Sequence, residues 1–209
     1  MTNGFTAHPH ASPRDADPPA PERLALPELL APAGDMEKLD AALRYGANAV
    51  YLGGRGPNLR AGAQGFSADE LPEAVRRAHA VGAHVYYCLN SLPHQRHLRD
   101  VEAAMEEAHE AGVDALIVAD PGVARMARRR VPGLPLHIST QANTANAEAA
   151  LFWQDMGATR VNMARELDLN GIRELVGACP GMEFEAFVHG AVCLAVSGHC
   201  LLSAWMNNR

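Results

Sequence analysis

Short apolar runs alternate with helical patterns along most of the chain, and this alternation restricts the possible folds more than any other feature. The strand-like runs occupy residues 27–33, 47–54, 84–90, 114–120, 135–141, 158–166 and 183–190. Amphipathic stretches closed by Gly or Pro lie between them, and one of these opens with a capping box, Ser67 followed three residues later by Glu70. Runs that are apolar on both faces and repeat in this way predict a parallel sheet with right-handed crossovers.

The repeated strand–helix units resemble one another, which favours a sheet that closes into a barrel over an open sheet. No Gly-x-Gly-x-x-Gly fingerprint follows the first run, so we predict an α/β fold of the parallel (β/α) TIM-like barrel type. A doubly wound open sheet is the structural alternative. Because only seven strands are expected, we predict an incomplete barrel whose C-terminal remainder lies beyond Arg209. Residues 1–26 lack apolar periodicity and are predicted to be a disordered leader, which leaves 27–209 as the barrel domain.

Charge and cysteine usage limit the setting in which the chain works. Its four cysteines occur without a secretory signal and no apolar run is long enough to span a membrane, so we expect a reducing, cytoplasmic location without membrane contact. A formal net charge of −6 at pH 7 gives no general attraction for nucleic acid. Any RNA contact must therefore come from local groups.

Polar residues gather where the later strands are expected to end, which is where parallel barrels place their sites. Arg165 and Glu166 close the sixth run, and adjacent strand residues face opposite ways, so we expect Arg165 to point inward. Its planar guanidinium suits a carboxylate ligand. The alternative is that Arg165 and Glu166 form ordinary ion pairs with helix residues.

The segment after the fifth run offers hydroxyl and amide groups. Thr140, Gln141 and Asn143 are candidate substrate-binding residues, since such groups can read a flipped base or hold a carboxylate. The alternative is that Asn143 or Thr144 only caps the following helix.

The stretch 185–203 carries two cysteines among small residues. Glu185 and His189 are candidate catalytic residues beside Cys193 and Cys200, although His189 could equally be a packing residue. A direct Glu185–His189 protease dyad is excluded, because four residues of strand separate the two by roughly 13 Å. Neither a His-Glu-x-x-His nor a Gly-x-Ser-x-Gly motif is present. Cys193 paired with His189 or His199 leaves a thiol protease as an open alternative.

The same stretch, Glu-x-Phe-x-x-Gly-Ala-Val-Cys-x4-Gly-x-Cys-x-Leu-Ser, resembles the signature of peptidase family U32. The members that it resembles most are iron–sulfur hydroxylases that work without oxygen on tRNA uridine, ribosomal RNA cytidine or a quinone precursor. The resemblance implies that Cys193 and Cys200 are the first two ligands of a 4Fe-4S cluster, with the remaining ligands beyond Arg209. Two further segments also resemble the family, PNLRAGAQGF with Asn58 and Arg60 as substrate-binding candidates, and the Arg-Glu-Leu run at Arg165.

The segment STQANTAN (139–146) is similar to the RNA-modifying branch of the family. This implies a hydroxylase that forms 5-hydroxyuridine at the tRNA wobble position, with prephenate as the hydroxyl donor and with tRNA bound partly by the missing C-terminal parts. The alternatives are a collagenase-like U32 peptidase, a hydroxylase of ribosomal RNA or of a quinone precursor, and a non-catalytic RNA-binding barrel.

Overall fold

The computed structural model describes residues 26–55, 65–190 and 195–197. Seven strands form one sheet in the order β1-β2-β3-β4-β5-β6-β7, and every neighbouring pair is parallel. The strands are β1 (Leu30–Pro32), β2 (Ala49–Leu52), β3 (His84–Leu89), β4 (Ala115–Val118), β5 (Leu136–Ile138), β6 (Arg160–Asn162) and β7 (Glu183–Glu185). The predicted leader, residues 1–26, falls almost wholly outside the described part.

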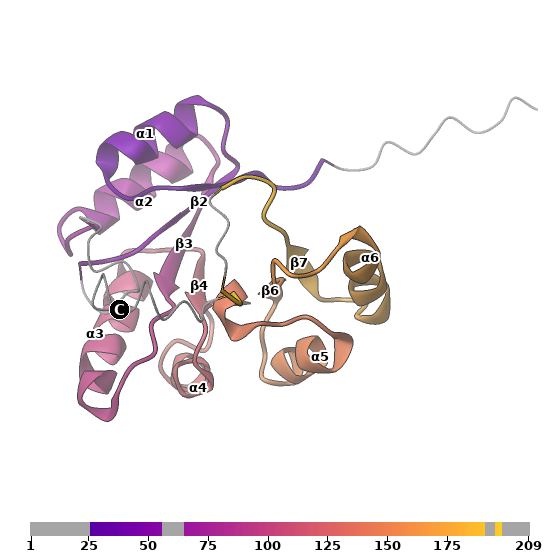
Figure 1. Cartoon of the computed structure of the whole chain (residues 1–209). Helices are drawn as coiled ribbons and strands as arrows, with labels where there is room; N and C mark the ends of the chain where they lie inside the picture. The colour runs from indigo at the N-terminus through magenta and orange to yellow at the C-terminus, as the bar shows by residue number, and fades with distance from the viewer. Residues whose placement is uncertain (1–25, 56–64, 191–194, 198–209) are drawn as a thin grey trace, which may run out of the picture.

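A helix follows each of the first six strands and lies on the outer side of the curled sheet (Figure 1). The helices are α1 (Met36–Arg44), α2 (Leu71–Ala80), α3 (Leu98–Glu110), α4 (Pro121–Arg130), α5 (Ala147–Asp155) and α6 (Leu169–Ala178), with short 3-10 turns η1 (Gln95–His97) and η2 (Thr140–Ala142). The arrangement is a TIM-like half-barrel with seven described strands, against the eight of a closed barrel. The predicted fold class is confirmed, and the doubly wound alternative is wrong because the strand order follows the chain order without a reversal.

Local sequence signals set where the helices begin. The Asp35 carboxylate accepts a hydrogen bond from the Lys38 backbone N–H at 2.8 Å and caps α1. Ser67 and Glu70 exchange the two bonds of a capping box in the turn before α2, with Ser67 N donating to Glu70 at 2.9 Å and Glu70 N donating to Ser67 Oγ at 3.3 Å. The predicted capping box is confirmed, although α2 itself begins after it, at Leu71.

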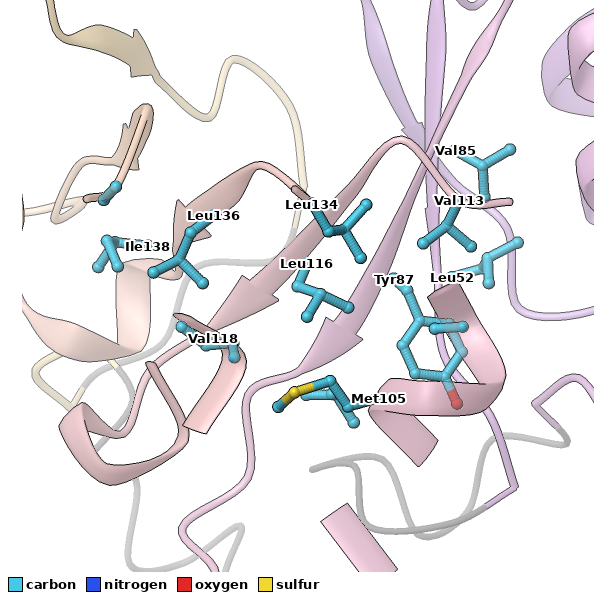
Figure 2. Close-up of a cluster of buried hydrophobic side chains, with 14 of the residues drawn as sticks. Leu52, Val85, Tyr87, Met105, Val113, Leu116, Val118, Leu134, Leu136 and Ile138 are labelled. Carbon is cyan, nitrogen blue, oxygen red and sulfur yellow. The ribbon is translucent and has the colours of Figure 1, made fainter. Parts of the chain in front are cut away.

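Alternate strand residues divide into two faces. The outer face packs against the helices and forms the main core, to which Val85, Leu116 and Ile138 belong together with Met105 of α3 (Figure 2). The inner face carries a second, smaller apolar cluster of Ala49, Tyr86, Ala115 and Ile117, with Leu30, Tyr51 and Cys88 against it. The inner face of β1 to β4 is therefore largely apolar, as expected for the packed interior of a barrel.

The last three strands are shorter than the sequence predicts. β5 ends at Ile138, β6 at Asn162 and β7 at Glu185, whereas the apolar runs extend to residues 141, 166 and 190. The chain leaves the sheet at these points because the residues that follow bond locally: Ser139 caps η2, and residues 165 and 166 form a turn. The side chains after these strand ends consequently do not alternate between two faces.

Candidate functional site

The inner face changes character at β5. Every second residue of the last three strands is polar, and these residues occupy the positions that Tyr86 and Ile117 occupy on the earlier strands. They are His137 on β5, Arg160 and Asn162 on β6, and Glu183 and Glu185 on β7. The half-barrel interior is thus apolar on one side and polar on the other, with polar groups at both ends of the strands.

At the amino ends of these strands lies a group that we call the floor cluster, made of Glu28, Tyr86, Arg160 and Glu183. Arg160 donates through Nη1 to Glu28 at 2.6 Å and through Nη2 to Glu183 at 2.7 Å, and its guanidinium lies 5.1 Å from the centre of the Tyr86 ring. The Tyr86 hydroxyl donates to Glu28 at 2.8 Å. Burial alone would raise the pKa of Glu28, but the bonds from Arg160 and Tyr86 hold it below its ordinary value. This end of the interior is closed by a well-bonded ion network.

His137 lies between the floor cluster and the opposite end. Its ring packs edge-on against Tyr86 with centroids 4.7 Å apart, and only 6% of the residue is exposed. Burial, together with the charge of Arg160, lowers the pKa of His137 to about 3. The imidazole is therefore neutral at physiological pH, and no described residue donates to or accepts from its Nδ1.

The carboxyl ends of β5, β6 and β7, with the residues that follow them, form what we call the mouth. Asn162 and Glu185 are partners in register across β6 and β7, and Asn162 Nδ2 donates to Glu185 Oε1 at 2.6 Å. Burial raises the pKa of Glu185 to about 7, although the charge of Arg160 and the Asn162 hydrogen bond both lower it. A carboxyl group with such a pKa can donate or accept a proton near neutral pH.

Hydrogen-bonding capacity remains unused at the mouth. Within the described ranges, four buried side-chain atoms lack a partner, and all of them lie on β5, β6 or the segment after β5: His137 Nδ1, Asn143 Oδ1, Thr144 Oγ1 and Asn162 Oδ1. Buried polar groups are usually satisfied, so a local concentration of exceptions is typical of a ligand site.

The segment after β5 holds three predicted substrate-binding residues. The Thr140 hydroxyl donates to the Met163 carbonyl at 3.0 Å and so ties this segment to the chain beyond β6. Gln141 lies in η2, and Asn143 adopts the left-handed conformation with φ of 53°. The suggestion that Asn143 or Thr144 caps the next helix is wrong, because Asn146 caps α5 by accepting from Ala149 N at 3.0 Å.

Arg165 and Glu166 meet Ser197, a contact that sequence reasoning did not foresee. Arg165 Nε donates to Ser197 Oγ at 3.2 Å, and the Ser197 backbone N–H donates to Glu166 Oε1 at 2.8 Å. Burial opposes ionisation of Glu166, but the bonds from Ser197 outweigh it and lower its pKa. The prediction that the two side chains face opposite ways is wrong, because β6 ends before them and both lie in a turn. Arg165 also lies over the Phe187 ring at 5.8 Å.

His189 is exposed and lies four residues beyond the end of β7, not at its end as predicted. The 13 Å separation from Glu185 assumed a continuous strand, which the chain does not form here. Four predicted site residues fall outside the described part of the chain, namely Asn58, Arg60, Cys193 and Cys200.

No group of three or more His, Cys, Asp or Glu side chains among the described residues is arranged to hold a metal ion. Nor does any helix in the described ranges have the length and apolar character needed to cross a bilayer.

Sequence reasoning missed His137, Arg160 and Asn162. Their signal was a polar residue at every second position of a short apolar run, which marks one face of a strand. In β6, Arg160 and Asn162 flank the buried Val161, and in β7, Glu183 and Glu185 flank Phe184. Strands that are apolar on one face and polar on the other are normally read as solvent-facing, so the pattern did not indicate an interior site.

Relatives of this chain act on RNA or carry protease names. It is 43% identical over 183 residues to tRNA hydroxylation protein P of Escherichia coli (strain K12), an alignment that covers 88% of this chain and 40% of that protein. It is 39% identical over 176 residues to the 23S rRNA 5-hydroxycytidine C2501 synthase of the same organism, covering 84% of this chain and 26% of that protein. A collagenase of Porphyromonas gingivalis is 33% identical over 192 residues, covering 87% and 46%. The chain thus spans less than half the length of each of these relatives.

The fold comparison agrees with the sequence comparison. The structure of the U32 peptidase Mk0906 superposes with a TM-score of 0.64 at 15% identity, covering 81% of this chain and 71% of that one. The model of peptidase family U32 matches residues 34–209, which include the three strands of the mouth and the cysteine segment. The chain therefore belongs to peptidase family U32.

Proposed function

We propose that this chain is the barrel part of an RNA hydroxylase that converts the wobble uridine of tRNA to 5-hydroxyuridine. The observation that carries the proposal is its 43% identity to a tRNA hydroxylation protein over nearly the whole described fold. The polar mouth supports it, because this is the end where barrels of this type hold their substrates. The chain spans only 40% of the length of that relative.

The residues of the mouth have separate roles in this proposal. Glu185, with a pKa of about 7, is the proton donor or acceptor closest to the interior. Gln141 and Asn143 contact the base, while Thr140 holds their segment against Met163. Arg165 binds a carboxylate of the co-substrate, for which we propose prephenate, and Glu166 fixes Arg165 and Ser197 in place. His189 serves as a second proton-transfer group, and Asn58 and Arg60 contribute further substrate contacts.

A 4Fe-4S cluster completes the proposal. Cys193 and Cys200 would supply two of its thiolate ligands, and the other ligands would come from sequence beyond Arg209. The cluster would supply the electron transfer that an oxygen-independent hydroxylation requires. The cytoplasmic location predicted from the cysteine usage suits such a cluster.

Mass analysis of tRNA nucleosides from a gene-deletion strain tests the function directly. We expect 5-hydroxyuridine and its derivatives to disappear on deletion, to return with the wild-type gene and to stay absent with Cys193→Ser. A strain carrying Glu183→Gln serves as a matched control, because Glu183 lies on the same strand at the floor and should leave the modification intact. Unchanged nucleosides in the deletion strain would refute the proposal.

The relationship to the Porphyromonas gingivalis collagenase favours a peptidase as the second candidate. In that case gelatin or a collagen peptide would be cleaved by the purified protein, and Cys193→Ala or His189→Ala would abolish the cleavage. The ribosomal RNA hydroxylase relative makes cytidine in 23S rRNA a further substrate, which the same nucleoside analysis of rRNA would reveal.

A further inference from the structure

Asn162 and Glu185 form a hydrogen-bonded pair whose hydrogen-bonding capacity is only partly filled. The Asn162 amide N–H donates to one oxygen of Glu185 at 2.6 Å. No described residue donates to Asn162 Oδ1, although the residue is only 8% exposed. The second carboxyl oxygen of Glu185 likewise receives no hydrogen bond from the described residues. The pair therefore holds one buried acceptor without a described partner, on Asn162, and one further carboxyl oxygen, on the partly exposed Glu185.

The unsatisfied acceptor requires a partner. A buried acceptor that receives no hydrogen bond loses its interaction with water and gains nothing in return, so such atoms are uncommon in native proteins. The other described atoms of this kind, on His137, Asn143 and Thr144, belong to the neighbouring strand and the segment after it. Because the buried atoms without hydrogen-bond partners are concentrated on β5, β6 and the segment after β5, they indicate a ligand at this place rather than scattered packing defects.

The protonation state of Glu185 decides what the ligand must offer. With its pKa near 7, the carboxyl group is protonated in a large share of molecules at neutral pH, and the proton sits on the oxygen that Asn162 does not contact. The pair then offers an acceptor and a donor. The complementary ligand has a donor and an acceptor side by side, as the edge of a pyrimidine base does.

We propose that Asn162 and Glu185 together bind the edge of a uracil base, with Asn162 Oδ1 accepting from the base N3–H and the Glu185 carboxyl donating to the base O4. This inference rests on the proposed function, in which a uridine leaves the RNA stack and enters the mouth. Asn162 Oδ1 is shielded from solvent and Glu185 is partly exposed, so the base has to enter past Glu185 and the Asn162 amide has to turn toward it. The base is then held by its edge, and its C5 is left unobstructed by this pair.

NMR titration of the 209-residue chain with uridine and with 3-methyluridine tests the pairing. The methyl group removes the N3–H donor and adds bulk at the same position, so we expect 3-methyluridine to bind at least about tenfold more weakly, the loss of one good hydrogen bond. Uridine binding should weaken as pH rises from 6 to 8, because ionised Glu185 has no proton to donate. Equal affinity for the two nucleosides, or no uridine binding at all, would overturn the inference.

Variants separate the roles of the two residues. Glu185→Gln keeps a carbonyl for Asn162 and an N–H for the base O4, so it should bind uridine as well at pH 8 as at pH 6. Asn162→Leu should lose the preference for uridine over 3-methyluridine while keeping the far-UV circular dichroism of the wild type. Glu183→Gln, two residues away on β7, is the control and should change neither. A pH dependence that persists in Glu185→Gln would exclude Glu185 as the donor.

A failure of the uracil-binding inference can be told apart from a failure of the proposed hydroxylase function. If the deletion strain loses its tRNA modification but Asn162→Leu restores it as fully as the wild type, the function stands and the inference is wrong. If the deletion leaves tRNA unchanged, the function itself is wrong.

Discussion

The floor cluster and the mouth share strands β6 and β7, but the polar side chains of the floor are fully paired and those of the mouth are not. At the floor, Arg160 bonds to both Glu28 and Glu183, and Tyr86 bonds to Glu28. The mouth lies two residues further along β6 and β7. There Asn162 donates one hydrogen bond to Glu185, but its own side-chain oxygen has no described partner. One end of the half-barrel interior therefore contributes stability, and the other keeps hydrogen-bonding capacity for a ligand, as the general division of barrel ends leads one to expect.

His137 lies at the boundary of the two regions, and it should have the largest effect on the free energy of unfolding. Its folded-state pKa of about 3 lies below the ordinary 6.5, so the folded protein binds fewer protons than the unfolded chain between these values. Stability is therefore lost as pH falls through this window, by up to about 5 kcal/mol from this residue alone and by about 3 kcal/mol between pH 7 and pH 4. His137→Leu should remove this part of the acid sensitivity in urea unfolding measured from pH 7 to pH 4. His109→Gln, an exposed histidine on α3, is the control, and equal slopes for all three proteins would contradict the prediction.

Removing the charge of Arg160 at the centre of the floor cluster should give the second-largest loss of stability. Arg160→Met leaves the partly buried Glu28 and the more exposed Glu183 without their cation, and we expect a loss of about 2 to 3 kcal/mol in the free energy of unfolding. Urea unfolding at pH 7 measures it. Arg76→Met provides the comparison, because its ion pair with Glu73 lies on the exposed surface of α2 and should matter little. A loss no greater than that of Arg76→Met would show that the floor is not a stabilising network.

The smallest change in the free energy of unfolding should come from a substitution at the mouth, and it should be stabilising. Thr144→Val replaces a fully buried hydroxyl that has no described partner with a methyl group of the same shape, so we expect the protein to become more stable by about 0.5 to 1 kcal/mol. Thr140→Val is the matched variant, because its hydroxyl donates to the Met163 carbonyl and its removal should destabilise by about 1 kcal/mol. Urea unfolding of both would settle the contrast. If Thr144→Val destabilises as much as Thr140→Val, the mouth has no spare hydrogen-bonding capacity at this position.

Much of the fold could be predicted because its signals are local. The alternation of apolar runs with helical patterns, the cap at Asp35 and the capping box at Ser67 and Glu70 each depend on residues within a few positions of one another. The site was predictable only in outline. Glu185 and the segment from Thr140 to Asn143 lie at the mouth as expected, but the ends of the last strands, and with them the positions of Arg165, Glu166 and His189, were wrong.

The sequence by itself determined the order and direction of the strands and the residues that alternate along them, since a two-residue period is a property of the extended chain. The tertiary structure alone decided that the polar face of β6 and β7 turns inward, where Arg160 reaches Glu28 from 132 positions away and Asn162 meets Glu185. The physical reason is the curvature of the sheet. A flat sheet with these strands would expose that face to water, whereas the curled one shields it from solvent, and only then do the unpaired atoms of the mouth acquire an energetic cost that a ligand can relieve.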